Sequence, residues 1–315
     1  WNGGAPVTAG IAAQANGNLQ ARVAEGQGII PIDGEALTSP TSYGDDRLFV
    51  YVRDETAPDG VQDDAFLRLR QAGFPVLSIS LRDRYDLGGE FFRWEFATAV
   101  AGSLLHVNPF DQPDVEGSKE AMRRLTKVCE TLGQLPEELP VCFDADTGLS
   151  MFADDSNAVA VGAGNFDRRP SLRDAVSAHL GRIESGDYFA ILAYLQLSDR
   201  HMKVLQKLRH LIRDATGSAT CLQFGPRFLH TTGQAYKGGP NSGVFLQITC
   251  DDSEDLDVPG QQYTFGVVKA AQARGDLSVL GERGRRAIRI HIQGDVYTGL
   301  ESLASIVGQS IGQTG

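Results

Sequence analysis

Short apolar runs alternate along this chain with helical patterns, and this alternation restricts the fold more than any other feature. Residues 28–32, 46–53 and 75–81 form apolar runs of strand length. Strands that are apolar on both faces are typical of parallel sheets, because the helices that connect such strands cover the sheet. The sequence therefore predicts an α/β protein with a parallel sheet sandwiched between helices.

The first half of the chain also supplies three predicted helices, at 63–73, 90–107 and 113–132. The first has acidic residues at its start and Gly73 at its end, which are the usual boundary signals of a helix. The second is apolar over most of its length and is expected to be buried. We assign these elements and the chain before them to one α/β domain, residues 1–135.

The pattern changes in the second half. Residues 136–186 contain clusters of Pro, Asp and Gly and are predicted to connect two domains, with a strand-like run at 157–163. From residue 187 to 315 the expected order is β-α-β-β-α-β-α, which predicts a C-terminal α+β domain of split βαβ type. Its strands are expected at 187–195, 219–224, 243–249 and 286–292, and its helices at 199–217, 264–274 and 295–308.

Composition and charge exclude several classes of function. The chain has 315 residues, 42% of them hydrophobic and 22% charged, and a formal net charge of −11. A nucleic-acid or anionic membrane surface needs clustered Lys and Arg, so neither partner is expected. No apolar run reaches the ~18 residues of a membrane-spanning helix. The chain begins without a secretory signal or an initiator Met, which predicts a fragment or a processed chain.

The cysteines and histidines do not predict a metal site. The four cysteines form no CxxC pair, and the histidines have no metal-ligand spacing. Four cysteines in a chain of this length are typical of reduced, mostly buried thiols in the cytoplasm. We therefore expect a cytoplasmic protein without a metal or other cofactor.

The start of the helix at 113–132 carries polar side chains on one stripe. Each helical residue advances ~100° around the axis, so Gln112, Glu116 and Lys119 fall close together, beside an apolar stripe. A helix start also favours bound anions through its free N–H groups and dipole. The stripe predicts either the rim of an anion-binding cleft or a solvated face with a Glu116–Lys119 pair.

A glycine-rich loop at 230–243, "HTTGQAYKGGPNSG", lies between two predicted strands. Gly-rich backbone beside Lys237 and several hydroxyl groups can bind phosphate through N–H groups. The loop lacks the GK[ST] ending of a Walker A motif. The alternative is a long hairpin connection in which glycine supplies positive φ angles.

Several motifs resemble one enzyme family. "GSLLHVNPFDQPDVEGSK" is similar to the second signature of phosphoglucose isomerases, except that Asp114 stands where that signature has Gly or Ala. "YGDDRLFVYVR", "FRWEFATAVAG", "FGPRFLHTTGQAYKGGPNSGVFLQIT" and "GRRAIRIHI" resemble the isomerase half of bifunctional transaldolase/phosphoglucose isomerases. The resemblance covers about residues 19–295.

This resemblance implies a fold, a reaction and partners. It implies a sugar-isomerase-type domain that interconverts glucose 6-phosphate and fructose 6-phosphate through a cis-enediol. By the same resemblance, Lys119 lies near the ring oxygen and Gln112 contacts the substrate phosphate. The transaldolase barrel and most of the first sugar-isomerase subdomain are not in this sequence, and they are the expected partners. A homo-oligomer is left open.

The catalytic base is harder to assign. The family places a Glu in a segment like "AESTGK" shortly before "GxGIIPV", whereas residues 19–32 read "LQARVAEGQGIIPI". The resemblance assigns the base to Glu25, although the "STGK" portion is missing. An alignment without a gap places Gln20 there instead, and an amide cannot accept the proton. The remaining alternative is that Glu25 is an ordinary surface carboxylate.

The group that opens the sugar ring has two candidate locations. The segment "YGDDR" offers Asp45 and Asp46 but no imidazole, and His230 at the start of the glycine-rich loop is the alternative. We therefore predict a site that combines Glu25, Lys119, Gln112, His230 and Lys237. The competing hypothesis is a non-catalytic module that binds sugar phosphates or takes part in assembly.

Overall fold

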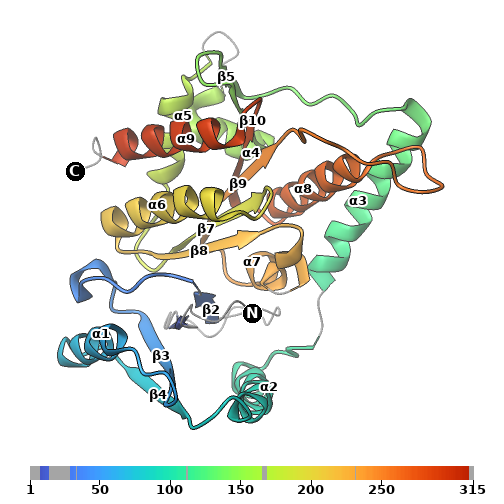
Figure 1. The fold of residues 1–315 in the computed structure, drawn as a ribbon. Helices are drawn as coiled ribbons and strands as arrows, with labels where there is room; N and C mark the ends of the chain where they lie inside the picture. Colours follow the sequence, from blue (N-terminus) through green and yellow to red (C-terminus); the bar gives the residue numbers. More distant parts are fainter. Residues whose placement is uncertain are drawn as a thin grey trace.

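The structure is a computed structural model that describes residues 8–13, 29–32, 34–110, 113–164, 169–230 and 232–311. Its strands form two sheets, one of four strands and one of six. Figure 1 shows the smaller sheet beside the larger one, with the long helix α3 (Pro113–Leu132) next to α8 (Phe265–Glu282). The predicted α/β class is confirmed.

The first sheet has the strand order β2-β1-β3-β4. Its strands are β1 (Thr8–Ala13), β2 (Ile29–Ile32), β3 (Arg47–Asp54) and β4 (Val76–Leu81). The last two strands are parallel and joined by α1 (Gly60–Gln71), whereas β1 runs antiparallel to both of its neighbours. The predicted strands and helix lie close to these bounds. The sheet is mixed, so the fully parallel sheet predicted for this half is wrong.

The second sheet has the strand order β5-β6-β10-β9-β7-β8. Its strands are β5 (Cys142–Asp144), β6 (Leu149–Phe152), β7 (Tyr188–Tyr194), β8 (Ala219–Phe224), β9 (Gly243–Cys250) and β10 (Arg286–Ile292). The last four are mutually parallel neighbours, and the first two add an antiparallel edge. A split βαβ unit would require an antiparallel strand between parallel ones. The predicted elements exist, but that arrangement is wrong.

Helices cover both faces of the second sheet. The long helices of this unit are α5 (Leu172–Leu180), α6 (Asp199–Thr216), α8 (Phe265–Glu282) and α9 (Val296–Ile311). One apolar cluster contains strand residues such as Ile191 and Ile290 with the buried faces of α5, α6 and α9. A second cluster, on the other face, contains Leu192 and Phe245 with residues of α8. Two-sided covering explains why β7 is buried at all seven positions.

The predicted connecting region contributes to this second sheet. Residues 136–186 supply β5, β6 and α5, and β6 pairs directly with β10. The strand-like run at 157–163 is helical: α4 (Asp155–Ala158) leads into a π-helical turn, η2 (Val159–Ala163). Asp154 caps α4 by accepting from the backbone amides of Ser156 and Asn157. This cap outweighs the β-propensity of the valines that follow.

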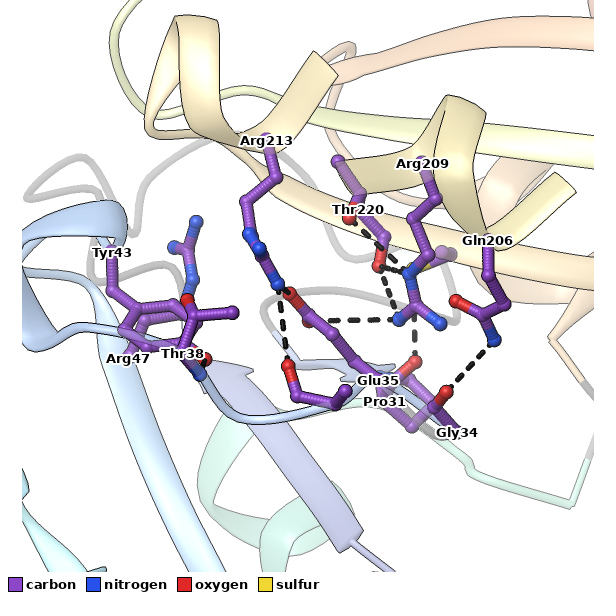
Figure 2. Close-up of polar contacts among 12 residues, drawn as sticks. Pro31, Gly34, Glu35, Thr38, Tyr43, Arg47, Gln206, Arg209, Arg213 and Thr220 are labelled. Carbon is purple, nitrogen blue, oxygen red and sulfur yellow. Dashed lines mark hydrogen bonds and ion pairs between the residues drawn. The ribbon is translucent and has the colours of Figure 1, made fainter. Parts of the chain in front are cut away.

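A buried ion cluster joins the two sheets, and Figure 2 shows Glu35 between two arginines of α6. The Glu35 carboxylate lies 2.5 Å from Arg213 and 3.6 Å from Arg209. Arg209 also donates to the Thr220 carbonyl on β8 at 2.7 Å, and Gln206 donates to the Gly34 carbonyl. The segment after β2 is thereby fixed against α6 and β8.

The helix at 90–107 differs from its expected environment. It forms α2 (Asp86–Leu105), but only Glu90 and Gly102 are buried in it, while Phe92 and Phe96 are exposed. The expectation that this helix is buried is therefore wrong for the described residues. Among those residues, no helix combines the length and apolar character needed to cross a membrane. The four cysteines are free thiols, as predicted.

Candidate functional site

Glu116 and Lys119, the described members of the polar stripe predicted near the start of α3 (Pro113–Leu132), lie at the border of the buried helix face. Val115 and Cys129 are buried, and the Lys119 side chain is 37% exposed. The Lys119 ammonium lies 2.5 Å from the Glu116 carboxylate. This hydrogen bond holds the pKa of the Glu116 carboxyl below its ordinary range. A charged Glu116 therefore holds the ammonium at the helix rim.

The first turn of α3 is fixed to the glycine-rich loop by Asp114. The Asp114 backbone amide donates to the Gln234 side-chain carbonyl at 3.0 Å, and the Gln234 amide donates to the Asp114 carboxylate at 2.8 Å. Arg283, which follows the last residue of α8, lies 2.5 Å from the same carboxylate. Asp114 and Gln234 are buried, so this two-way contact is shielded from competing water.

The glycine-rich loop is a crossover connection and not a hairpin. It includes the 3₁₀ turn η3 (Arg227–His230) and the short helix α7 (Gly233–Gly238), and it joins two strands that lie on opposite sides of β7 and run parallel. The described glycines of this loop have no positive φ angle. The hairpin alternative is therefore wrong, and Gly233 serves close packing, since a Cβ there would lie 3.2 Å from the Phe228 carbonyl.

Lys237 lies in the interior beneath α8. Its ammonium is 2.5 Å from the Asp276 carboxylate, and the two side chains are 1% and 0% exposed. Gln247 of β9 donates to the Ala273 carbonyl at 3.0 Å and lies 3.5 Å from Asp276. In this arrangement Lys237 forms a buried structural ion pair, and its charge is not available to a ligand in solvent.

The contact between α3 and α8 determines where the start of α3 lies. At Gly275, a Cβ would come within 3.1 Å of both the Met122 amide and the Ser118 carbonyl. Glycine therefore allows the two helices to approach closely. It does not end α8, which continues well beyond the predicted boundary at 274. Beside this crossing, a groove of about 410 Å³ is lined by Arg123, Arg124 and Arg283 together with acidic residues.

Three predicted site residues cannot be placed with their side chains. Glu25 and Gln112 lie outside the described residues, and for His230 the backbone is described but the side chain is not. The nearest described segment after Glu25 is β2. Ile30 and Ile32 of β2 share an apolar cluster with Phe228 and Tyr236, which flank the glycine-rich loop's first residues. Strand β2 therefore packs with the residues on either side of His230.

Sequence reasoning missed Asp114 and Gln234 as partners. The available signal was the departure at Asp114 from the family signature, because a carboxylate in place of Gly or Ala requires a partner when it is buried. The described residues contain no group of His, Cys, Asp and Glu that could hold a metal ion. The described residues do bring together the start of α3, which carries the partly exposed Lys119, and the glycine-rich loop, which lies 120 residues later in the chain.

Comparison with known proteins gives short local matches. No family model matches the chain. The glucose-6-phosphate isomerase of Acholeplasma laidlawii is 42% identical over 71 residues, which are 21% of this chain and 17% of that protein. Those of Heliobacterium modesticaldum and Shouchella clausii are 47% and 49% identical over 47 residues, each 15% of this chain and 10% of the relative.

A solved structure gives a weaker similarity. The crystal structure of a hypothetical protein from Thermus thermophilus aligns with 83% of this chain and 55% of its own, with a TM-score of 0.39 and 13% identity. Similarity at this level does not establish a shared fold. The matched stretches span 10% to 17% of the lengths of the three isomerases. Short parts of this chain are therefore similar to glucose-6-phosphate isomerases.

Proposed function

We propose that the chain forms part of an aldose–ketose isomerase that interconverts glucose 6-phosphate and fructose 6-phosphate. The observation that carries the proposal is the Asp114–Gln234 contact, which joins two motifs that each resemble this enzyme family. The local matches to glucose-6-phosphate isomerases support the same reaction. The finer proposal is that the parent is a transaldolase fusion, whose other domains are this chain's partners.

Lys119 is proposed to assist ring opening as a cation near the ring oxygen of the substrate. Its ammonium is partly exposed and is held by an ion pair with Glu116 on the helix surface. An exposed pair of this kind is worth little, so a substrate oxygen can replace the carboxylate at small cost. Gln112 lies immediately before this helix and is the proposed phosphate contact, where the free N–H groups and dipole of the helix start favour an anion.

Glu25 is the proposed base that moves a proton between C1 and C2. It lies four positions before the start of β2, and four residues of extended chain reach at most ~14 Å. Because β2 shares an apolar cluster with the segment before α7, this reach supports a common location for Glu25 and His230. His230 is the proposed proton carrier for ring opening. Lys237 has no role in the proposed site, since its charge is paired with Asp276.

The test is steady-state isomerisation of fructose 6-phosphate by the polypeptide that carries this sequence. Lys119→Met should lower kcat/KM by at least ~10²-fold, which corresponds to about 2.7 kcal/mol of transition-state stabilisation. Lys127→Met is the matched control, because Lys127 is an exposed lysine two turns further along α3. Equal kcat/KM values for the two variants would exclude Lys119 from the reaction.

Glu25→Gln tests the base separately. It should lower isomerisation by ~10³-fold or more, while fructose 6-phosphate affinity stays within a few-fold, because the amide keeps the shape and cannot accept a proton. If both variants retain activity, the assignment of these residues is wrong. If the unmodified chain binds fructose 6-phosphate without turnover, the non-catalytic binding module replaces the enzyme proposal.

A further inference from the structure

One face of the second sheet is unusually polar for a covered parallel sheet. Tyr194, Thr249 and His291 are register partners across β7, β9 and β10, and Gln247 and Arg289 are partners in the row below. Parallel sheets covered by helices ordinarily carry apolar side chains on both faces. Tyr194, Thr249 and His291 lie at the carboxyl ends of their strands, and Gln247 and Arg289 lie two residues earlier in β9 and β10. The departure is therefore confined to the part of this face that extends from the middle of the strands to their carboxyl ends.

The strand order identifies these carboxyl ends as a preferred ligand position. From β7 the chain passes through α6 to β8 on one side, and from β9 it passes through α8 to β10 on the other. The two helices pack on opposite faces. A crevice therefore forms between the carboxyl ends of β7 and β9, where the winding reverses. Open α/β sheets bind ligands at such switch points.

A cavity lies at this position. Its volume is about 570 Å³, and its walls are the carboxyl ends of β7, β9 and β10, the residues after α3 and the first turns of α8. Pockets for small molecules have volumes of roughly 300–1,000 Å³. This cavity is separate from the candidate isomerase site. The helix α3 has 20 residues, or ~30 Å, with its start at that site and its end at the cavity.

The inner wall of the cavity carries surplus positive charge. Arg274 and Arg289 both bind one oxygen of Glu138, at 2.7 Å and 2.6 Å. Two guanidinium groups against one carboxylate leave a net charge of about +1. Arg289 is 4% exposed, and its Nε has no partner among the described residues. A buried unpaired donor beside an uncompensated charge is costly unless an anion binds there.

The acidic residues at the mouth of the cavity have other partners, and among the described residues the ion pairs of Arg274 and Arg289 are with Glu138. Asp252 pairs with Lys269, and Asp251 lies 3.2 Å from His291. Asp255 accepts from the backbone amides of Leu256 and Gly266. The inner wall thus carries a net charge of about +1, whereas in the described part of the chain only Asp252 at the mouth is neutralised by a cation.

Thr249 and His291 complete the polar wall. The His291 Nδ1 lies 3.0 Å from the Thr249 hydroxyl, and its Nε2 faces Asp251. Burial lowers the pKa of His291, although the nearby Asp251 raises it. A neutral imidazole can donate from only one nitrogen, and the carboxylate must accept, so the Thr249 hydroxyl donates to Nδ1. The Thr249 oxygen then presents acceptor lone pairs to the cavity.

We propose that this cavity binds a small anionic molecule whose carboxylate or phosphate group is held by Arg274 and Arg289. Planar guanidinium groups match both oxyanions. The hydroxyl acceptor at Thr249 suits a donor group on the remainder of the molecule. This proposal does not depend on the isomerase activity, because none of its residues belongs to the site at the start of α3.

The experiment is isothermal titration calorimetry of the full chain with inorganic phosphate and, separately, with succinate. The two titrations distinguish a phosphate ligand from a carboxylate ligand. At least one anion should bind, and Arg274→Gln should weaken that binding by ~10-fold or more. The Lys207→Gln variant, which changes an exposed paired lysine on α6, should bind the anion within two-fold of the unmodified chain.

A second variant is expected to raise the affinity for the anion. Glu138→Gln removes the carboxylate that competes for both arginines, so it should tighten binding of the same anion by several-fold. This result holds even where Arg274→Gln fails to fold. The proposal is overturned if neither anion binds, or if Arg274→Gln folds and binds like the unmodified chain. It is also overturned if Glu138→Gln leaves affinity unchanged.

Discussion

The two sheets of this molecule bury their strands to very different extents. In the second sheet, β7 is buried at every position and β9 at all but its last. In the first sheet, β4 buries only Ile79, and the local apolar cluster contains Phe49, Tyr51, Phe66 and Leu69. Both regions have similar apolar runs in the sequence. An apolar run therefore indicates the capacity for burial, whereas neighbouring elements decide whether burial occurs.

Two lysines illustrate the same difference on the scale of single residues. Sequence reasoning assigned Lys119 and Lys237 to one ligand site. The structure pairs Lys119 with a carboxylate at the surface and Lys237 with a carboxylate in the interior. An exposed pair contributes ~0–1 kcal/mol, whereas removing one member of a buried pair leaves an uncompensated charge. The two pairs should respond very differently to mutation.

Lys237→Met is expected to have the largest effect on stability. Asp276 would remain buried without its counter-charge, and breaking such a pair costs about 3–5 kcal/mol. Urea unfolding of the single variant should show this loss. The double variant Lys237→Met, Asp276→Leu should recover most of it, because a well-packed apolar pair replaces a buried ion pair at little cost.

Lys119→Met is the matched surface control and should change stability by less than ~1 kcal/mol. If Lys237→Met were as stable as this control, the buried pair would not stabilise the second sheet. A selective loss of sugar-phosphate binding in that variant would instead restore Lys237 to the ligand site.

The sequence predicted the elements of both sheets better than their pairing. The strand at 286–292 has its predicted bounds, and β7 differs by one residue at each end. Strand direction was not predictable for β9, because a buried strand has the same apolar pattern in a parallel and an antiparallel sheet. The glycines of 230–243 resembled those of a hairpin, although Gly233 is required for close packing of η3 and α7.

The sequence predicted which types of residue the candidate site contains, but it did not predict which residues contact one another there. The helical spacing of Glu116 and Lys119 predicted their ion pair, which the structure contains. The burial of Asp114 and its contact with Gln234 depend on tertiary packing between segments 120 residues apart. Similarly, Arg274 and Arg289 are unremarkable in the sequence, and only the packing of α8 and the segment after α3 against β10 brings them to one carboxylate. Local patterns carry no information about such distant neighbours.

An effect of intermediate size is expected on the pH dependence of stability, through a buried histidine that contacts the second sheet. His179 of α5 is buried, and its Nε2 lies 3.1 Å from the Phe245 carbonyl. Burial lowers its pKa to about 3, from an ordinary value of 6.5. Below pH 6.5 the unfolded chain binds a proton that the folded chain does not, so stability falls as pH decreases from 6.5 toward 3. Above pH 6.5 this group has no effect.

This dependence is measurable by urea unfolding at about pH 7.5 and about pH 5.5. The unmodified chain should lose about 1.4 kcal/mol more than His179→Gln over this interval, since one pH unit of differential protonation corresponds to ~1.4 kcal/mol. Gln keeps a donor for the Phe245 carbonyl and does not titrate. His201→Gln is the control, because His201 is only partly buried on the first turn of α6. Equal losses in the unmodified chain and His179→Gln would exclude the mechanism.

The smallest effect on the free energy of unfolding is expected for substitutions on α2, whose apolar side chains are largely exposed. Phe92 and Phe96 are 69% and 63% exposed and stack on each other with ring centroids 6.2 Å apart. Replacing both with Gln removes little buried area and introduces a better helix former, so the free energy of unfolding should change by less than ~0.5 kcal/mol. Phe66→Ala on α1, where the ring is buried, should cost ~3 kcal/mol or more. Urea unfolding with sedimentation analysis measures both quantities. A large destabilisation by the double Gln variant, or a change in its molecular mass, would mean that another surface covers α2 in solution. The difference in burial between the two regions would then hold only for the isolated chain.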